Sequence, residues 1–112
     1  MKVLAAIHDL MFSSKVNAAA RGKAIEWLPR GANVAEHVAA SKPDVLLIDL
    51  ASPKLDAINA IREIKKSGGP VVIGYVDHTR EDLIESARAA GCDQVMSKGE
   101  FARRLPELLE GI

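Results

Sequence analysis

The chain has 112 residues, of which 48% are hydrophobic and 27% charged. This is the balance of one globular domain, residues 1–112, and excludes a disordered chain or two domains. Fifteen basic and fifteen acidic side chains cancel, so the sequence lacks the basic surface that binding to nucleic acid or anionic lipid requires. The apolar runs are too short to cross a bilayer, and the opening run is typical of a buried strand rather than a signal peptide. The single cysteine, Cys92, excludes an internal disulfide and favours a reducing cytoplasm.

Short apolar runs alternate with segments of helical spacing along the chain. In chain order, the pattern predicts a strand over Lys2–Ile7, a helix from about Leu10 to Arg21, a strand over Ala24–Leu28, a helix from Asn33 to Ala40, a strand over Asp44–Leu50, a helix from Asp56 to Lys66, a strand over Val71–Val76, a helix behind Thr79 that ends at Ala90, a strand over about Gln94–Ser97 and a helix over about Glu100–Leu109. Asn33, Asp56 and the segment Thr79 to Asp82 are expected to cap the helices that follow them.

The alternation of strands and helices also predicts the fold class. Five βα units with short connections and right-handed crossovers place helices on both faces of a parallel sheet. At this length, the usual solution is the flavodoxin-like three-layer α/β sandwich, (βα)5, with strand order 2-1-3-4-5. The first and third strands are neighbours in that order.

Three polar side chains stand where predicted strands end, namely Asp9, Asp49 and Lys98. Because the carboxyl ends of parallel strands share one edge of the sheet, these side chains should meet there. Two close carboxylates repel unless a cation or a proton lies between them, and Mg²⁺ commonly takes one or two carboxylates with a phosphate oxygen. Lys98 would face a phosphoryl group and is expected to pair with Asp49. The chemistry indicated is phosphoryl transfer onto an aspartate, with the central Asp49 as the better nucleophile.

These residues resemble a known family. The segment Asp44–Ile64 is similar to the phosphoacceptor segment of response-regulator receiver domains, including the chemotaxis receivers, and places Asp49 at the phosphoacceptor position. Further matches lie at Pro53, Pro70–Ile73, Ala87–Gly91 and Lys98. The resemblance implies that Asp49 and Lys98 are the catalytic residues. It also implies Mg²⁺ bound by Asp9, Asp49 and Ala51, and for Asp9 we favour this role over that of a helix cap.

Several positions depart from the family pattern. His8-Asp9 stands where receivers usually have two adjacent acids, and Gly99 follows Lys98 in place of a proline. Either Tyr75 or Val76 takes the position of a short hydroxyl residue, and Val95 takes that of a switch aromatic. The chain therefore resembles an atypical receiver.

Alternative functions remain at this point. A stand-alone receiver would accept phosphate from a histidine kinase or phosphotransfer protein, with at most weak self-dephosphorylation. It would contact a downstream protein through the helix that ends at Ala90, the strand Gln94–Ser97 and the helix Glu100–Leu109. A pseudo-receiver would instead be a phosphorylation-independent scaffold for interaction or homodimerisation. A small-ligand domain is less favoured because no Gly-rich loop follows the first strand, and so is a transition-metal site of His8, Asp9 and His78.

Overall fold

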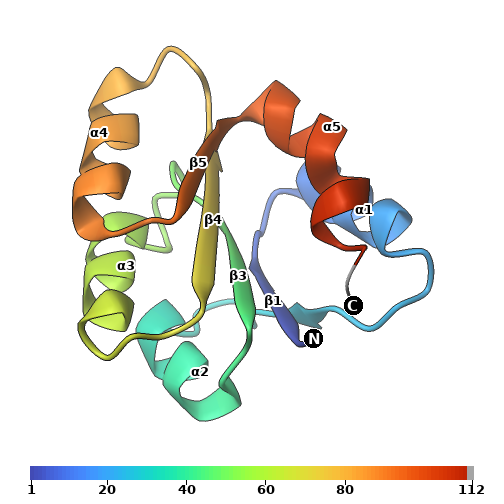
Figure 1. Cartoon of the computed structure of the whole chain (residues 1–112), viewed down its shortest axis with the longest axis horizontal. Coiled ribbons are helices and arrows are strands. Elements are labelled where there is room, and N and C mark those ends of the chain that lie inside the picture. Colours follow the sequence, from blue (N-terminus) through green and yellow to red (C-terminus); the bar gives the residue numbers. More distant parts are fainter. Residues whose placement is uncertain (111–112) are drawn as a thin grey trace.

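The computed structural model describes residues 1–110. Its strands are β1 (Val3–Ala6), β2 (Glu26–Trp27), β3 (Val45–Asp49), β4 (Val71–Val76) and β5 (Gln94–Ser97). Its helices are α1 (Leu10–Ala20), α2 (Val34–Ser41), α3 (Ala57–Lys66), α4 (Glu81–Ala90) and α5 (Lys98–Leu108). All five strands are parallel and form one sheet in the order β2-β1-β3-β4-β5. The predicted flavodoxin-like fold is confirmed (Figure 1).

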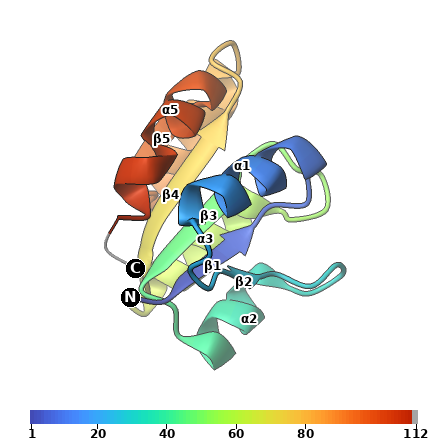
Figure 2. The ribbon, with the colours of Figure 1, turned by 90° about the vertical axis from the view of Figure 1, so that its right-hand side faces the viewer.

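The sheet lies between two layers of helices. Helices α1 and α5 pack on one face, while α2, α3 and α4 cover the other, as the two perpendicular views show (Figures 1 and 2). Strands β1, β3 and β4 are therefore buried on both sides, which explains why their sequences are continuous apolar runs without alternation.

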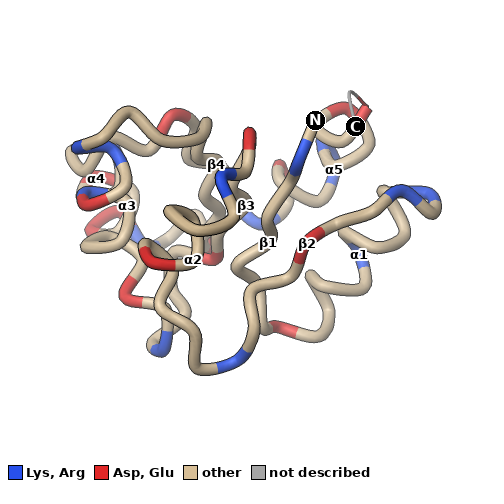
Figure 3. Tube along the Cα trace, turned by 90° about the horizontal axis from the view of Figure 1, so that it is seen from below, with Lys and Arg blue, Asp and Glu red and all other residues tan. Residues whose placement is uncertain are grey.

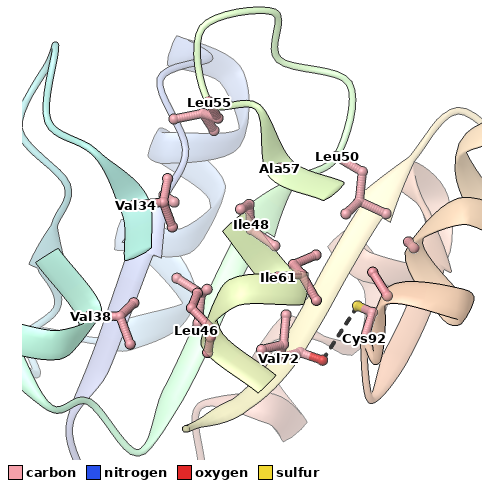
Figure 4. Packing of buried hydrophobic residues seen from close by; sticks show 14 of the residues in the cluster. Val34, Val38, Leu46, Ile48, Leu50, Leu55, Ala57, Ile61, Val72 and Cys92 are labelled. Atoms are coloured by element: carbon pink, nitrogen blue, oxygen red, sulfur yellow. Dashed lines mark hydrogen bonds between the residues drawn. The ribbon is translucent and has the colours of Figure 1, made fainter. Parts of the chain in front are cut away.

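The larger core cluster fills the layer between the sheet and helices α2 to α4 (Figure 4). Leu46, Ile48 and Val72 project from β3 and β4 onto Ile61 of α3 and Val38 of α2. A fully buried leucine or isoleucine side chain stabilises a fold by about 1.5–3 kcal/mol. On the opposite face the core contains three aromatic side chains, Phe12, Tyr75 and Phe101.

Helix starts confirm some of the predicted caps and correct others. Asn33 caps α2, since its side chain accepts a hydrogen bond from the Glu36 N–H at 2.9 Å. Asp56 stands at the start of α3 but makes no side-chain cap bond, because its carboxylate accepts from the Asn59 side chain. The capping box predicted before α4 is wrong. No side chain of the described residues accepts a hydrogen bond from the first N–H groups of α4, and the Thr79 hydroxyl donates instead to Asp77, which precedes the helix.

A turn with a buried Pro70 joins the end of α3 to the start of β4 at the amino edge of the sheet. The Lys65 ammonium lies 2.6 Å from Oδ2 of Asp93 and donates to the Pro70 carbonyl at 2.9 Å. The same Asp93 oxygen accepts the Val72 N–H at 2.7 Å. This group of contacts ties the start of β4 to the turn before β5.

Basic and acidic positions lie interspersed over the chain trace (Figure 3). Within residues 1–110, no helix combines the length and the apolar character needed to cross a membrane.

Candidate functional site

The sheet order brings the three predicted site residues to one edge. Asp49 is the last residue of β3, Asp9 follows the neighbouring β1, and Lys98 begins α5 directly after β5. Asp49 is half-buried, whereas Asp9 and Lys98 are exposed. The carboxyl edge of the sheet thus carries two acids close together and a cation from a more distant strand.

Asp49 has a raised pKa at this edge. Burial raises the pKa of its carboxyl, and the negative charge of Asp9 acts in the same direction. The Ala51 N–H, which donates to Oδ1 of Asp49 at 3.1 Å, and the Lys98 ammonium oppose that rise. The net pKa is higher than usual, so a bound cation or a covalent substituent that removes the negative charge would relieve an unfavourable interaction.

Asp9 has a structural role that we ranked second on sequence grounds. Its Oδ1 accepts the Phe12 N–H at 3.0 Å and so caps helix α1. This bond leaves Oδ2 for another ligand. The cap is therefore established, while the metal-binding role of Asp9 stays a prediction.

The ion pair expected between Lys98 and Asp49 is absent. Within residues 1–110, no carboxylate lies within ion-pair distance of the Lys98 ammonium. Lys98 is the first residue of α5, whose start is fixed by Ser97, and its side chain is exposed. Its charge still lowers the pKa of Asp49 and also contributes at Asp77. Lys98 is therefore a shared cation of this edge rather than the partner of one acid.

Asp77 is an edge residue that the sequence reasoning missed. It follows β4 directly, while Asp9 comes three residues after the end of β1, and its place after a strand is the signal that would have found it. The Thr79 N–H and hydroxyl donate to its Oδ1 at 3.0 and 2.9 Å. These bonds hold the pKa of Asp77 below its usual range, with smaller contributions from His78 and Lys98.

The strand register settles which residue of β4 lies beside Asp49. Tyr75 is directly opposite Asp49, and Val76 follows it on the other face of the sheet. The Tyr75 ring is stacked between Phe12, at a centroid distance of 4.6 Å, and Phe101, at 4.5 Å. Its hydroxyl is buried and has no hydrogen-bond partner among the described residues.

The transition-metal alternative is wrong. Nε2 of His8 lies 3.2 Å from the Leu28 carbonyl and is occupied by that contact, while Nδ1 of His78 lies 3.6 Å from Oδ1 of Asp77. In the described part of the chain, no three His, Cys, Asp or Glu side chains gather closely enough to hold a metal ion.

The donor set does fit a hard divalent cation that keeps several waters. Asp9 and Asp49 supply carboxylate oxygens, and Ala51 can supply only its backbone carbonyl. Mg²⁺ is commonly bound by one or two carboxylates with waters and a phosphate oxygen. The raised pKa of Asp49, to which Asp9 contributes, is the feature of this structure that a cation between the two acids would offset.

Comparison of the sequence with protein-family models and with curated proteins gave no match. Comparison of the structure gave many. A response regulator from Hahella chejuensis superposes with a TM-score of 0.82 at 18% identity, covering 97% of this chain and 92% of that one. The response regulator domain of Thermotoga maritima CheB gives 0.75 at 23%, covering 99% and 92%.

A third structure is the receiver domain of the sensor histidine kinase PA1611 from Pseudomonas aeruginosa, which has a magnesium ion coordinated in its active-site cleft. Its TM-score is 0.70 at 20% identity, and the match covers 97% of each chain. These similarities span nearly the whole of each domain at low identity, so they establish architecture. The chain has the receiver-domain fold of response regulators.

Proposed function

We propose that this chain is a receiver of two-component signalling in which Asp49 accepts a phosphoryl group. The observation that carries the proposal is the position of Asp49: half-buried at the end of the central strand, with a raised pKa, beside Asp9 and within electrostatic reach of Lys98. Phosphorylation would replace the single charge of this carboxylate with a more negative acyl phosphate, so Lys98 and a bound cation are needed to offset the charge at this position.

The reaction is transfer from a phosphohistidine of a histidine kinase or phosphotransfer protein. A carboxylate oxygen of Asp49 attacks phosphorus, an oxygen–phosphorus bond forms, and the phosphorus–nitrogen bond to the imidazole breaks. The departing imidazole then takes up a proton. Lys98 offsets negative charge on the transferred group, which is a large part of what catalysis requires in phosphoryl transfer. Because its ammonium forms no ion pair within residues 1–110, it is available to turn toward that group.

Mg²⁺ is the cation proposed for this site, held by Asp9, Asp49 and the carbonyl of Ala51. When bound, the ion supplies charge neutralisation for the phosphoryl oxygens. Asp9 keeps α1 capped through Oδ1 and would offer Oδ2, so binding need not disturb the helix. The donor chemistry, two carboxylates and a carbonyl, supports this assignment.

The partners proposed are proteins. The downstream protein would contact the face made by α4, β5 and α5, as the resemblance implies, and β5 is an edge strand of the sheet. Interspersed charges support a protein partner over nucleic acid. A free, buried cysteine is compatible with the reducing cytoplasm.

A second candidate is a phosphorylation-independent scaffold, which would act through another protein or a second copy of the chain. Two observations favour it. Lys98 forms no ion pair with Asp49 within residues 1–110, and Tyr75 stands opposite Asp49 in place of a small hydroxyl residue. Binding of a phosphoryl mimic at the site distinguishes the two functions, because only a phosphoacceptor requires it.

The test is amide NMR on wild type, Asp49→Asn and Asp56→Asn, titrated with magnesium and then beryllofluoride, an acyl-phosphate mimic. Asp56→Asn is the matched control, because it is the same chemical change on an exposed residue whose φ of 47° suits asparagine. We expect saturable shifts at Asp9, Ala51 and Lys98 in wild type and the control, and none in Asp49→Asn. No beryllofluoride response in wild type would reject the phosphoacceptor function and favour the scaffold.

A further inference from the structure

Tyr75 has a buried hydroxyl that stands apart from the hydrogen bonds of residues 1–110. The side chain is fully buried, and its hydroxyl meets no hydrogen-bond partner among the described residues. Buried polar groups of native proteins are nearly always hydrogen-bonded, since an unmade bond loses the hydration that the group had in water. An apolar ring of the same shape, phenylalanine, would fill the position without that loss. The hydroxyl is therefore a buried donor for which the described residues provide no acceptor.

The site edge is where such an acceptor would lie. Tyr75 pairs with Asp49 across the β3–β4 ladder and lies in the core on the α1/α5 side of the sheet. Strand alternation places Asp49 on the same face as Leu47, which belongs to that core. Burial is the main cause that raises the pKa of the Tyr75 hydroxyl far above its usual value, and the carboxylates of Asp49 and Asp9 add to the rise. The hydroxyl thus stays protonated, as a donor, within electrostatic reach of both acids.

The ring of Tyr75 also connects the segments that carry the site. Phe12, stacked on one side with an interplanar angle of 20°, lies in the first turn of α1, and its N–H is bonded to Asp9. Phe101, stacked on the other side at 17°, lies in the first turn of α5, which begins at Lys98. A movement of the Tyr75 ring must therefore shift the starts of both helices.

We propose that Tyr75 is a positioning residue of the Asp49 site, whose hydroxyl donates a hydrogen bond to an oxygen of a phosphoryl-class anion bound there. The Phe12–Tyr75–Phe101 stack then carries occupancy of the site to α1 and α5. The proposal rests on the phosphoacceptor function of Asp49. It deepens that function by assigning a role to Tyr75, which stands in place of a short hydroxyl residue.

Tyr75 is the single tyrosine of the chain, so a tyrosine label at Cζ gives one NMR signal that reports on the hydroxyl. Wild type and Tyr75→Phe are titrated with beryllofluoride in the presence of magnesium, and Asp49→Asn is the control without a bound anion. Urea denaturation of the free proteins is measured alongside. The Cζ signal of the wild-type protein reports on hydrogen bonding of the Tyr75 hydroxyl without any mutation.

We expect the wild-type Cζ signal to shift on addition of beryllofluoride, with no shift in Asp49→Asn. Tyr75→Phe should bind beryllofluoride at least about tenfold more weakly, as for a lost hydrogen bond to a charged group. The same variant should unfold at an equal or higher urea concentration, a combination that a merely structural tyrosine would not give. Shifts of the Phe12 and Phe101 amides should accompany binding in wild type and shrink in Tyr75→Phe.

Two results would overturn the proposal in distinguishable ways. If wild type binds beryllofluoride while the Cζ signal stays fixed and Tyr75→Phe binds equally well, the role of Tyr75 is rejected and the phosphoacceptor function stands. If wild type shows no response at Ala51 or at Cζ, the phosphoacceptor function fails, and the positioning role fails with it.

Discussion

The Leu50 side chain fills the space that a Cβ atom on Gly74 would occupy. A Cβ built on Gly74 would lie 2.7 Å from Cδ2 of Leu50 and 2.9 Å from its Cδ1. Leu50 is buried, directly follows Asp49, and its N–H donates to the Tyr75 carbonyl at 3.0 Å. The missing side chain at position 74 therefore lets the residue after Asp49 pack onto β4.

Gly74→Ala should destabilise the fold by about 1–3 kcal/mol, the usual cost of forcing extra atoms into a packed core. The reason is that Leu50 must leave its place, and urea denaturation measures the effect. Gly99→Ala is the matched control, because a Cβ there meets nothing within 4 Å. In helix α5 that change should be neutral or gain up to about 1 kcal/mol. Unchanged stability of Gly74→Ala would mean that Leu50 repacks freely.

Asp49→Asn should raise the stability of the free protein at neutral pH by on the order of 0.5 kcal/mol. The folded-state pKa of Asp49 is raised, so its charged form lowers stability once the pH exceeds that value. Below the unfolded value of about 3.9, the acid is protonated in both states and the penalty disappears. Asparagine can still accept the Ala51 N–H.

The measurement is urea denaturation of wild type and Asp49→Asn at neutral pH and at a pH of about 3.5, where the difference between them should shrink. Asp56→Asn, on an exposed acid, serves as the control and should differ little from wild type at either pH. A loss of more than about 1 kcal/mol in Asp49→Asn at neutral pH would assign Asp49 a structural role instead.

Asp93 predicts the opposite pH dependence. Burial opposes its ionisation, but the Lys65 ammonium and the Val72 N–H outweigh burial and hold the pKa of Asp93 below its usual range. The stability that it contributes is present above the unfolded value of about 3.9 and is lost as the pH falls through the lower folded value. Asp93→Asn should cost about 0.5–1 kcal/mol at neutral pH, a small value because the side chain is 41% exposed.

Denaturation of Asp93→Asn and wild type across acid pH would check this, since the two should converge as the pH drops. Glu63→Gln is the comparison: Glu63 pairs with Lys66, and both side chains are exposed, so its effect should stay within about 0.5 kcal/mol at every pH. A pH-independent loss in Asp93→Asn would point to packing rather than to charge.

The sheet and its order were predictable because a strand buried on both faces appears in the sequence as a short, continuous apolar run. That signal does not depend on which contacts the individual side chains make. β3 shows this: its run of apolar residues ending in Asp49 fixed both the strand and the acid. Neighbouring positions of the first and third strands followed from topology alone.

Local side-chain contacts were less predictable, since the same residue type can either cap a helix or take part in a functional site. Ser97 starts α5 at Lys98, earlier than predicted, because its hydroxyl accepts the Glu100 N–H at 3.1 Å. The spacing Ser97 to Glu100 matches the signature of a helix start and could have been used. The place of the Lys98 side chain depends on that start, so no strand pattern could give it.

Asp9 offers a way to separate a cap from a charge. Asp9→Ala should cost about 0.5–2 kcal/mol, because the Phe12 N–H loses its acceptor. Asp9→Asn should retain most of that stability, since asparagine caps helices as well as aspartate does. Both variants remove the negative charge that raises the pKa of Asp49, so the Asp49 carboxyl should titrate at lower pH in each.

NMR titration of the Asp49 carboxyl carbon, with urea denaturation of the same samples, measures both effects. Equal destabilisation by Asp9→Asn and Asp9→Ala would show that the charge, and not the cap, carries the stability. An unchanged Asp49 titration in both variants would show that the two carboxylates do not interact. The metal site proposed at Asp9 and Asp49 would then lose its physical basis. That basis is the repulsion between two nearby carboxylates, which a bound cation offsets.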